Sequence, residues 1–375
     1  MLIGVPKEIK NHEYRVGLTP VSVRELIANG HKVMMQTGAG LGIGEAGDAY
    51  TDAGATIAAS AEQVFAEAEM IVKVKEPQPD ECKMLRSGQV LFTYLHLAPD
   101  PTQTRLLQES DSIAIAYETV TDREGGLPLL APMSEVAGRM SIQAGAACLE
   151  KSKGGSGKLL GGVPGVAPAN VLVIGGGVVG TNAIQMAVGM GANVTVLDRS
   201  IVRLRELDAQ FGGQISTVYS TKSALEQHVA NTDLVIGAVL IPGAAAPKLI
   251  TRDMLKTMRK GSVLVDVAID QGGCFETSKA TTHEDPTYIV DDVVHYCVAN
   301  MPGAVANTSA HALNHATLPF TMALANLGYR EALKKDDNLL QGLNVHHGVI
   351  TNKPVADALD LPYAEPASVL APHAA

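Results

Sequence analysis

Short apolar runs alternate along the chain with longer stretches of mixed polarity. In the first third, Leu2–Val5, His31–Gln36, Met70–Val74, Val90–Leu95 and Ser112–Ala116 are apolar runs of strand length. Such continuous runs are typical of strands buried on both faces of a parallel sheet. A helix is predicted over 22–29, between the first two runs, and a flexible loop over the glycine-rich segment 38–44.

The same alternation returns after a long predicted helix over 132–151 and a glycine-rich surface loop over 153–163. The most regular unit is a strand over 171–174, a turn over 175–180, a helix over 181–190 and a strand over 193–197. Further strands are predicted over 234–238, 262–267 and 288–290, and a last helix over 312–327.

These elements predict an α/β protein with two Rossmann-like parallel-sheet domains separated by a cleft. A chain of 375 residues is too long for one ordinary core. The last residues of the chain, about fifty in number, are too few for a separate domain, so we expect them to pack on the N-terminal one. The predicted domains are 1–128 with 307–375, which is discontinuous, and 129–306.

Charge and cysteine content narrow the class of partner. The formal net charge of -10 disfavours nucleic acid and anionic membranes, and an anionic ligand would have to be bound by a few local cations. The uncharged stretch 170–197 contains too many glycines and amides for a membrane span. Four scattered cysteines without metal spacing predict reduced thiols, and with no signal segment at the N-terminus we expect a cytoplasmic protein.

A glycine motif follows the apolar strand 171–174. Gly175, Gly177 and Gly180 satisfy the pattern G-x-G-x-x-G, and the motif opens a predicted helix. Alone the pattern is weak, but strand, turn and helix together are the context of a dinucleotide-binding fingerprint. Asp198 lies roughly 20 residues further on, where a carboxylate binds the ribose hydroxyls and repels a 2′-phosphate. We therefore predict NAD as the cofactor, although Arg203 and its neighbouring arginines weaken the case against NADP.

Four polar residues are candidates for chemistry, and each also has an ordinary explanation. His96, Lys75 and Asp270 follow predicted strands, where α/β proteins place their sites. Histidine suits proton transfer near neutral pH, and lysine or arginine suits a carboxylate. By itself each could be a solvated side chain, and nothing local distinguishes Arg15 from a surface arginine. Asp266 is a rival of Asp270, but its place within a strand favours a structural role.

Read together, six ordered segments resemble the alanine dehydrogenase family along nearly the whole chain. They are Gly4-Val-Pro-Lys-Glu8 with Arg15-Val-Gly-Leu-Thr-Pro20, Val72-Lys-Val-Lys-Glu-Pro77, Leu95-His-Leu-Ala98, Gly161-Gly-Val-Pro-Gly165, Asp266-Val-Ala-Ile-Asp-Gln-Gly-Gly-Cys274 and Asn300-Met-Pro-Gly-Ala-Val305. Six matches in order are far more specific than any one of them.

The resemblance implies a homohexameric, NAD-dependent enzyme that converts L-alanine reversibly to pyruvate and ammonium. It makes the first domain the substrate domain and the second the NAD-binding domain. Arg15 and Lys75 would bind the substrate, His96 would be the acid–base, and Asp270 would assist it. The cofactor residues implied, besides the three glycines of the motif, are Ser134, Val178, Val179, Asp198, Arg203, Ser220, Val239, Leu240, Val267, Asp270, Lys279, Asn300 and Met301.

The sequence departs from the family pattern in two places. Ala306-Asn307 replaces a proline and a basic or aromatic residue in an implied hinge, and segment 325–329 lacks a metal-binding histidine, so no metal is expected. Two alternatives stay open: the NAD(H)-binding component of a proton-pumping transhydrogenase, and a non-catalytic NAD-sensing or lysine-pathway homologue. His96 and the lack of a membrane segment disfavour the first, and the lack of extra polar anchors disfavours the second.

Overall fold

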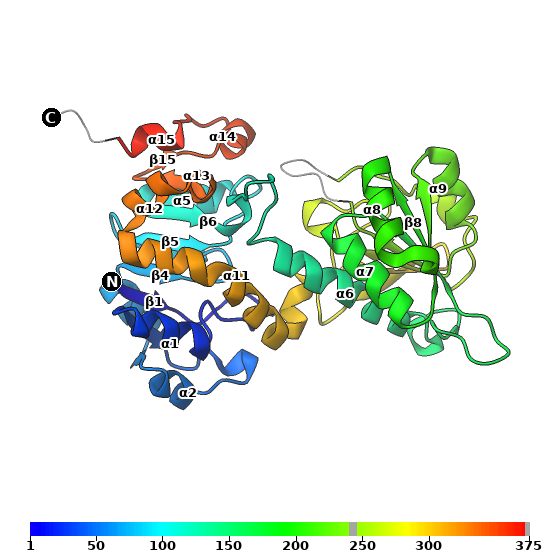
Figure 1. Cartoon of the computed structure of the whole chain (residues 1–375), viewed down its shortest axis with the longest axis horizontal. Coiled ribbons are helices and arrows are strands. Elements are labelled where there is room, and N and C mark those ends of the chain that lie inside the picture. Colours follow the sequence, from blue (N-terminus) through cyan, green and yellow to red (C-terminus); the bar gives the residue numbers. More distant parts are fainter. Residues whose placement is uncertain (240–245, 372–375) are drawn as a thin grey trace. The chain divides into compact units, whose positions relative to one another are not determined.

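The computed structural model describes residues 1–239 and 246–371, which divide into two compact units (Figure 1). The first unit is Met1–Met133 with Gly303–Ala375, and the second is Ser134–Pro302. The first division falls inside helix α6 (Ala131–Cys148), because that helix runs on from one unit into the other. The sequence placed these divisions after residues 128 and 306.

The first unit contains an eight-stranded sheet in the order β15-β14-β6-β5-β4-β1-β2-β3. The six strands from β6 to β3 are parallel, and β14 and β15 are antiparallel additions at one edge. The strands are β1 (Leu2–Val5), β2 (Lys32–Gln36), β3 (Thr56–Ala58), β4 (Met70–Val72), β5 (Val90–Thr93), β6 (Ile113–Ala116), β14 (Leu343–His346) and β15 (Val349–Ile350). The chain order reverses between β1 and β4, which is where open α/β sheets bind ligands.

Helices of the first unit begin at well-formed caps. Thr19 caps α1 (Pro20–Ala28), Ser60 caps α3 (Ala61–Glu67) and Asp100 caps α5 (Pro101–Glu109), each accepting a hydrogen bond from the first turn. The remaining helices are α2 (Gly47–Asp52), α4 (Pro79–Met84), α11 (Ala306–Leu327), α12 (Tyr329–Lys335), α13 (Asp337–Leu340), α14 (Lys353–Leu359) and α15 (Pro366–Val369). Side chains of α3, α4, α5 and α14 form one hydrophobic cluster with β4, β5 and β6. That core fixes the strand ends from which the site is built.

The second unit repeats this order in a seven-stranded sheet, β12-β13-β11-β10-β7-β8-β9. All neighbours are parallel except β12 and β13. The strands are β7 (Asn170–Ile174), β8 (Asn193–Asp198), β9 (Ile215–Tyr219), β10 (Leu234–Gly237), β11 (Val263–Asp266), β12 (Thr287–Val290) and β13 (Val293–Tyr296). The helices after α6 are α7 (Val178–Gly189), α8 (Ile201–Phe211), α9 (Lys222–Val229) and α10 (Arg252–Leu255). Here the chain order reverses between β7 and β10.

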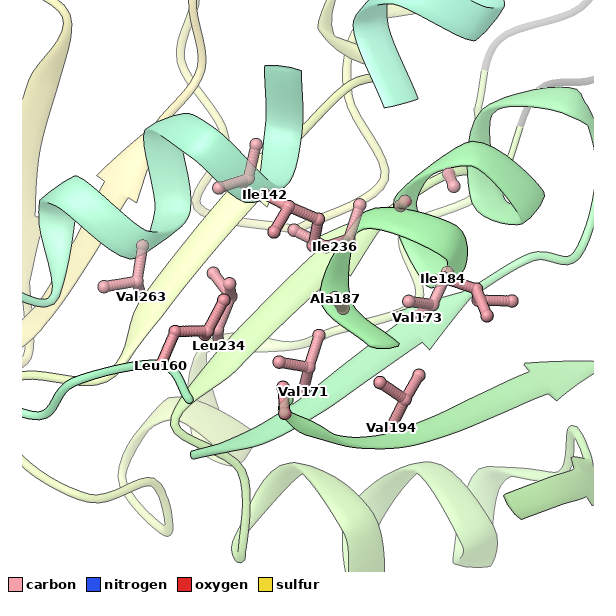
Figure 2. Packing of buried hydrophobic residues seen from close by; sticks show 14 of the residues in the cluster. Ile142, Leu160, Val171, Val173, Ile184, Ala187, Val194, Leu234, Ile236 and Val263 are labelled. Carbon is pink, nitrogen blue, oxygen red and sulfur yellow. The ribbon is translucent and has the colours of Figure 1, made fainter. Parts of the chain in front are cut away.

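Alternate residues of the central strands of this unit face opposite layers of helices. Figure 2 shows Val171 and Val173 of β7 packed with Ile142 of α6 and Ile184 of α7. The intervening Leu172 and Ile174 join a second cluster with side chains of α9 and α10. Burial on both faces is the reason that these strands are continuous apolar runs.

Most of the predicted strands and the α/β class are confirmed, with boundaries shifted by a few residues. The prediction of a flexible loop over 38–44 is wrong in part, because Leu41–Ile43 form a 3₁₀ turn. Helix α11 begins at Ala306 rather than at residue 312. In the described residues, no helix combines the length and apolar character that a membrane span requires.

Candidate functional site

The first unit brings Lys75 and His96 to neighbouring positions at the carboxyl edge of its sheet. Lys75 follows β4 and His96 follows β5, and these strands are parallel neighbours. Beyond the strands, the Tyr94 N–H donates to the Val74 carbonyl over 3.3 Å, and Thr93 Oγ1 donates to the Lys75 carbonyl over 3.0 Å. The backbone pairing therefore continues up to both candidate side chains.

Arg15, which no local pattern distinguishes from a surface arginine, is buried in the first unit. Its side chain is 2 % exposed and forms a fork with Glu13, with Nε and Nη2 donating to the two carboxylate oxygens over 2.7 and 2.6 Å. Burial alone would lower the pKa of Arg15, but the hydrogen bonds and charge of Glu13 raise it. Nη1 points to Sδ of Met133 at 3.0 Å. The guanidinium is therefore a fixed, charged group.

The segment that carries Arg15 is held against β4 and α11. A Cβ on Gly17 would lie 2.4 Å from the Val72 carbonyl oxygen, so only glycine allows this approach. On the other side, the Thr19 N–H donates to Oδ1 of Asn314 in α11 over 2.9 Å. The Asn307 amide at the start of α11, in the implied hinge segment, donates to the Ile43 carbonyl over 2.6 Å.

His96 is presented by a strained backbone turn that Glu118 stabilises. Its φ of 51° is unusual for a residue other than glycine. The Glu118 carboxylate accepts the His96 N–H over 2.6 Å and the Leu95 N–H over 3.2 Å, and lies 3.8 Å from Nδ1 of the ring. The His96 ring stacks on buried Tyr94 with centroids 5.8 Å apart, while its side chain stays 46 % exposed. An imidazole that is fixed in position but accessible from solvent can exchange a proton with a ligand.

Tyr94 connects His96 with Arg15 in the interior of the unit. Its hydroxyl donates to the Leu129 carbonyl over 2.5 Å, and burial raises its pKa far above neutrality. The charge of Arg15 acts on this phenol in the opposite direction. His96 therefore stacks on a neutral, fixed ring, on which the charge of Arg15 also acts.

A buried ionic cluster lies beneath Lys75. We call Glu8, Lys73 and Glu81 the Glu8 cluster: Lys73 Nζ contacts Glu8 at 3.0 Å and Glu81 at 2.8 Å, and all three side chains are at most 3 % exposed. The second oxygen of Glu8 accepts the N–H of Val74 over 2.7 Å and of Lys75 over 3.4 Å. Burial raises the pKa of Glu8, against the opposing effect of Lys73. Sequence reasoning missed this cluster, because its members are far apart in the chain.

In the second unit, each glycine of the motif meets a different steric demand. Gly175 has a φ of 98°, and a Cβ there would lie 2.7 Å from the Ala238 carbonyl oxygen. A Cβ on Gly180 would lie 1.8 Å from the Gly175 carbonyl oxygen, so Gly180 permits the close packing of α7 on the turn. At Gly177, nothing lies within 4 Å of the ideal Cβ position. Space is therefore free in front of the N-terminus of α7, where a diphosphate binds.

Asp198 and Arg203 brace this glycine turn from the neighbouring strand and helix. Asp198 accepts the Gly176 N–H and the Ser200 N–H, each over 2.7 Å. Arg203 donates from Nε to the Gly176 carbonyl and from Nη2 to Thr181 Oγ1, each over 2.6 Å, and pairs with Glu206. The guanidinium of Arg203 is thus engaged by the protein, which weakens the objection that it would attract a 2′-phosphate.

Several other predicted cofactor residues lie at the same edge of this sheet. The Ser220 N–H donates to the Asp198 carbonyl over 2.9 Å, and the Val267 N–H donates to the Gly237 carbonyl over 3.0 Å. A side-chain carbon of Val239 lies 3.0 Å from the ideal Cβ position of Gly175. Val178 and Val179 are the first residues of α7, next to this turn.

The remaining predicted cofactor residues are more dispersed. Ser134 is in the first turns of α6, and the backbone N–H of exposed Lys279 donates to Tyr288 Oη over 2.7 Å. Asn300 has a φ of 58°, and its carbonyl accepts from His283 over 3.1 Å. Met301 packs in the hydrophobic core at 3 % exposure. Leu240 lies outside the described residues.

The two aspartates at and after the end of β11 differ as the sequence indicated. Asp266 is fully buried and accepts the N–H groups of Ala268 and Cys274 and the hydroxyl of Ser278, while burial raises its pKa. Asp270 is exposed, in the 3₁₀ turn Ile269–Gln271. Asp266 thus shapes the loop that presents Asp270. In the described part of the chain, no group of three His, Cys, Asp or Glu side chains is placed to hold a metal ion.

The fold and the glycine turn define a dinucleotide-binding α/β protein of the two-unit dehydrogenase type, and comparison with known proteins identifies its family. The model of the alanine dehydrogenase/PNT N-terminal domain matches residues 4–137, and that of the C-terminal domain matches 141–353. The chain therefore belongs to the alanine dehydrogenase/PNT family.

Named relatives are similar over their whole length. An alanine dehydrogenase of Halomonas elongata is 62% identical over 99% of this chain and 100% of its own length. One from Methanococcus maripaludis is 55% identical over 97% of this chain and 98% of its own. These matches confirm the resemblance seen in the sequence and the prediction of an NAD-dependent enzyme.

Two solved structures have folds similar to that of this chain. An L-alanine dehydrogenase structure superposes with a TM-score of 0.93 at 51% identity, covering 96% of this chain and 99% of that one. A transhydrogenase from Sinorhizobium meliloti gives a TM-score of 0.83 at 24% identity, covering 94% of this chain and 100% of that one. The second likeness shows the fold alone.

Proposed function

We propose that this chain catalyses the reversible reaction of L-alanine, NAD⁺ and water to pyruvate, ammonium, NADH and a proton. The observation that carries the proposal is the pairing of two sets of groups in one chain of this family. One set is the open glycine turn braced by Asp198. The other is the buried arginine and the strand-end lysine and histidine of the first unit.

The second unit is the NAD-binding domain in this proposal, and the first is the substrate domain. When bound, NAD⁺ would supply an acceptor for the hydride of the substrate carbon. The free space at Gly177 fits a diphosphate, and Asp198 presents a carboxylate beside the turn for the ribose hydroxyls. The expected contributors Ser220, Val239 and Val267 lie at the same sheet edge.

Arg15 and Lys75 bind the substrate in this account. Arg15 keeps its charge inside the protein because Glu13 pairs with it, and its guanidinium is the planar fork that suits a substrate carboxylate. Lys75 stands at the end of the neighbouring strand and, in the direction of alanine synthesis, polarises the oxo group of pyruvate. In a protein with a net charge of -10, Arg15 and Lys75 thereby supply local positive charge for an anionic substrate.

His96 is the acid–base group in this account. As the substrate carbon is oxidised, its ring takes the proton that the amine loses, and it then manages the protons of the attacking water and the leaving ammonia. Glu118 fixes the backbone of the turn and lies near Nδ1, which favours use of the other ring nitrogen for exchange. Asp270, an exposed carboxylate of the second unit, assists this proton transfer.

The proposal extends to assembly and location. The family resemblance favours a homohexamer, and the four buried, unpaired cysteines fit a reducing cytoplasm. Sedimentation at several concentrations tests the assembly. A monomer throughout would contradict it.

The direct test of the proposed activity is formation of NADH by the purified chain with L-alanine and NAD⁺, followed by absorbance. We expect turnover that requires both substrates and reverses with pyruvate, ammonium and NADH. L-serine, glycine and glyoxylate are the comparison substrates, since one methylene is worth only about 1–3 kcal/mol of discrimination. Clear NADH binding without turnover on any of them would instead favour the transhydrogenase-component alternative.

A further inference from the structure

The Glu8 cluster occupies the place in the first unit that the glycine turn occupies in the second. Both lie beyond the first strand of their sheet, next to the point where the chain order reverses. In the second unit, that place is kept open by Gly177. In the first unit it is filled by a protein carboxylate, Glu8, which accepts backbone N–H groups that follow β4.

We propose that Glu8 is a positioning residue for substrate binding, because it holds the backbone of Val74 and Lys75 at the end of β4. The proposal rests on the proposed function and deepens it, since it concerns the two cations assigned to the substrate. Glu8 itself is buried and is engaged by Lys73 and by the N–H groups of Val74 and Lys75.

The geometry distinguishes Glu8 from its partner Glu81. Both carboxylates contact Lys73 Nζ, at 3.0 and 2.8 Å, and both are buried. The second oxygen of Glu81 accepts the Gln78 N–H over 2.8 Å, at the start of α4 and beyond Lys75 in the chain. Of these two carboxylates, it is Glu8 whose second oxygen accepts the N–H of Lys75 itself, over 3.4 Å.

The charges around Glu8 tie it to Arg15 as well. Glu8 is one of the carboxylates whose charge acts on Arg15, after Glu13. Together Glu8, Glu13 and Glu81 face Lys73 and Arg15, so three buried negative charges stand against two positive ones. Removing the charge of Glu8 therefore changes both the position of Lys75 and the field at Arg15.

The test compares Glu8→Gln with Glu81→Gln in the full-length chain. Each variant removes one carboxylate from Lys73 and keeps the side-chain shape, so both should lose thermal stability to a similar extent. For Glu8→Gln we expect the KM for L-alanine and for pyruvate to rise about tenfold or more, equivalent to about 1.4 kcal/mol. For Glu81→Gln we expect a change of less than about threefold, while the KM for NAD⁺ stays within about twofold in both.

A control outside the cluster is Glu69→Gln. Glu69 accepts the Leu2 N–H over 2.7 Å at the amino ends of β1 and β4. It therefore makes a bond of the same kind at the end of these strands that is far from Lys75. We expect it to leave every kinetic constant unchanged. Equal KM changes in Glu8→Gln and Glu81→Gln, or a parallel rise in the KM for NAD⁺, would overturn the inference in favour of a merely structural cluster. An inactive wild-type chain would refute the proposed function instead.

Discussion

The two units share one strand order, but they differ at the point where the chain order of the strands reverses, between β1 and β4 in the first unit and between β7 and β10 in the second. In the second unit, glycines form the turn at this point, and nothing lies within 4 Å of the ideal Cβ position of Gly177. In the first unit the same point is packed with charge, where Glu8, Lys73 and Glu81 are buried beneath Lys75. A dinucleotide needs room for its diphosphate and backbone N–H groups to bind it. A small amino acid needs a few fixed ionic groups instead, so the same topology serves two ligands.

The residues that hold the functional groups also differ between the units. Asp198 and Arg203 brace the glycine turn from outside through backbone atoms. In the first unit, Glu13 and Glu118 brace the functional residues Arg15 and His96 themselves. Substitutions at Arg15, Lys75 and His96 should therefore affect chemistry and substrate affinity, and those at the glycine turn and its braces should affect NAD affinity.

The largest expected effect is that of His96→Ala on turnover. Losing a general acid–base group should lower kcat by about 10²–10⁴-fold. NADH affinity, measured by fluorescence titration, should stay the same, because the glycine turn belongs to the other unit. Full activity in this variant would remove His96 from the mechanism, and loss of NADH binding would break the division of roles.

A second pair of substitutions separates the two uses of glycine in the turn. Gly180→Ala forces a Cβ to within 1.8 Å of a carbonyl oxygen, so we expect a stability loss of about 1–3 kcal/mol or more in thermal unfolding. Gly177→Ala meets no atom within 4 Å, so stability should hold. Its methyl group should nevertheless weaken NADH binding about tenfold, or about 1.4 kcal/mol. Unchanged NADH affinity in Gly177→Ala would place the diphosphate elsewhere.

The smallest expected effect is that of Arg203→Gln. It removes the bonds to the Gly176 carbonyl and to Thr181, worth about 0.5–1.5 kcal/mol each. The KM for NAD⁺ should rise several-fold, and that for L-alanine should not. Arg205→Gln, at an exposed position of the same helix, is the matched control for loss of charge. An equal effect of both would indicate a general electrostatic contribution in place of bracing.

Local sequence patterns were sufficient for most of the sheet and for part of the site. Strands such as β5 and β7 are continuous apolar runs, because both faces are buried, and they were predicted. His96, Lys75 and Asp198 were found because they directly follow such strands. Strand β14 was missed, since its four residues include Asn344 and His346 among the apolar ones.

The part of the site that sequence patterns do not predict depends on contacts between segments that are distant in the chain. Glu8 meets Lys73, and Glu118 meets His96, only after the sheet has formed. Arg15 could not be told from a surface arginine, because its burial depends on Gly17, Asn314 and Met133 together. A charged residue carries no local signal that it will be buried, and only its partners in the fold decide this.

The division of roles between the units is tested most directly by a crossed measurement of both KM values in Lys75→Gln and Asp198→Asn. We expect Lys75→Gln to raise the KM for L-alanine and to leave the KM for NAD⁺ unchanged. We expect the reverse for Asp198→Asn, because the Asp198 carboxylate accepts the Gly176 N–H of the glycine turn. If either substitution raised both constants to the same extent, the two units would not have separate ligands and the account would be wrong.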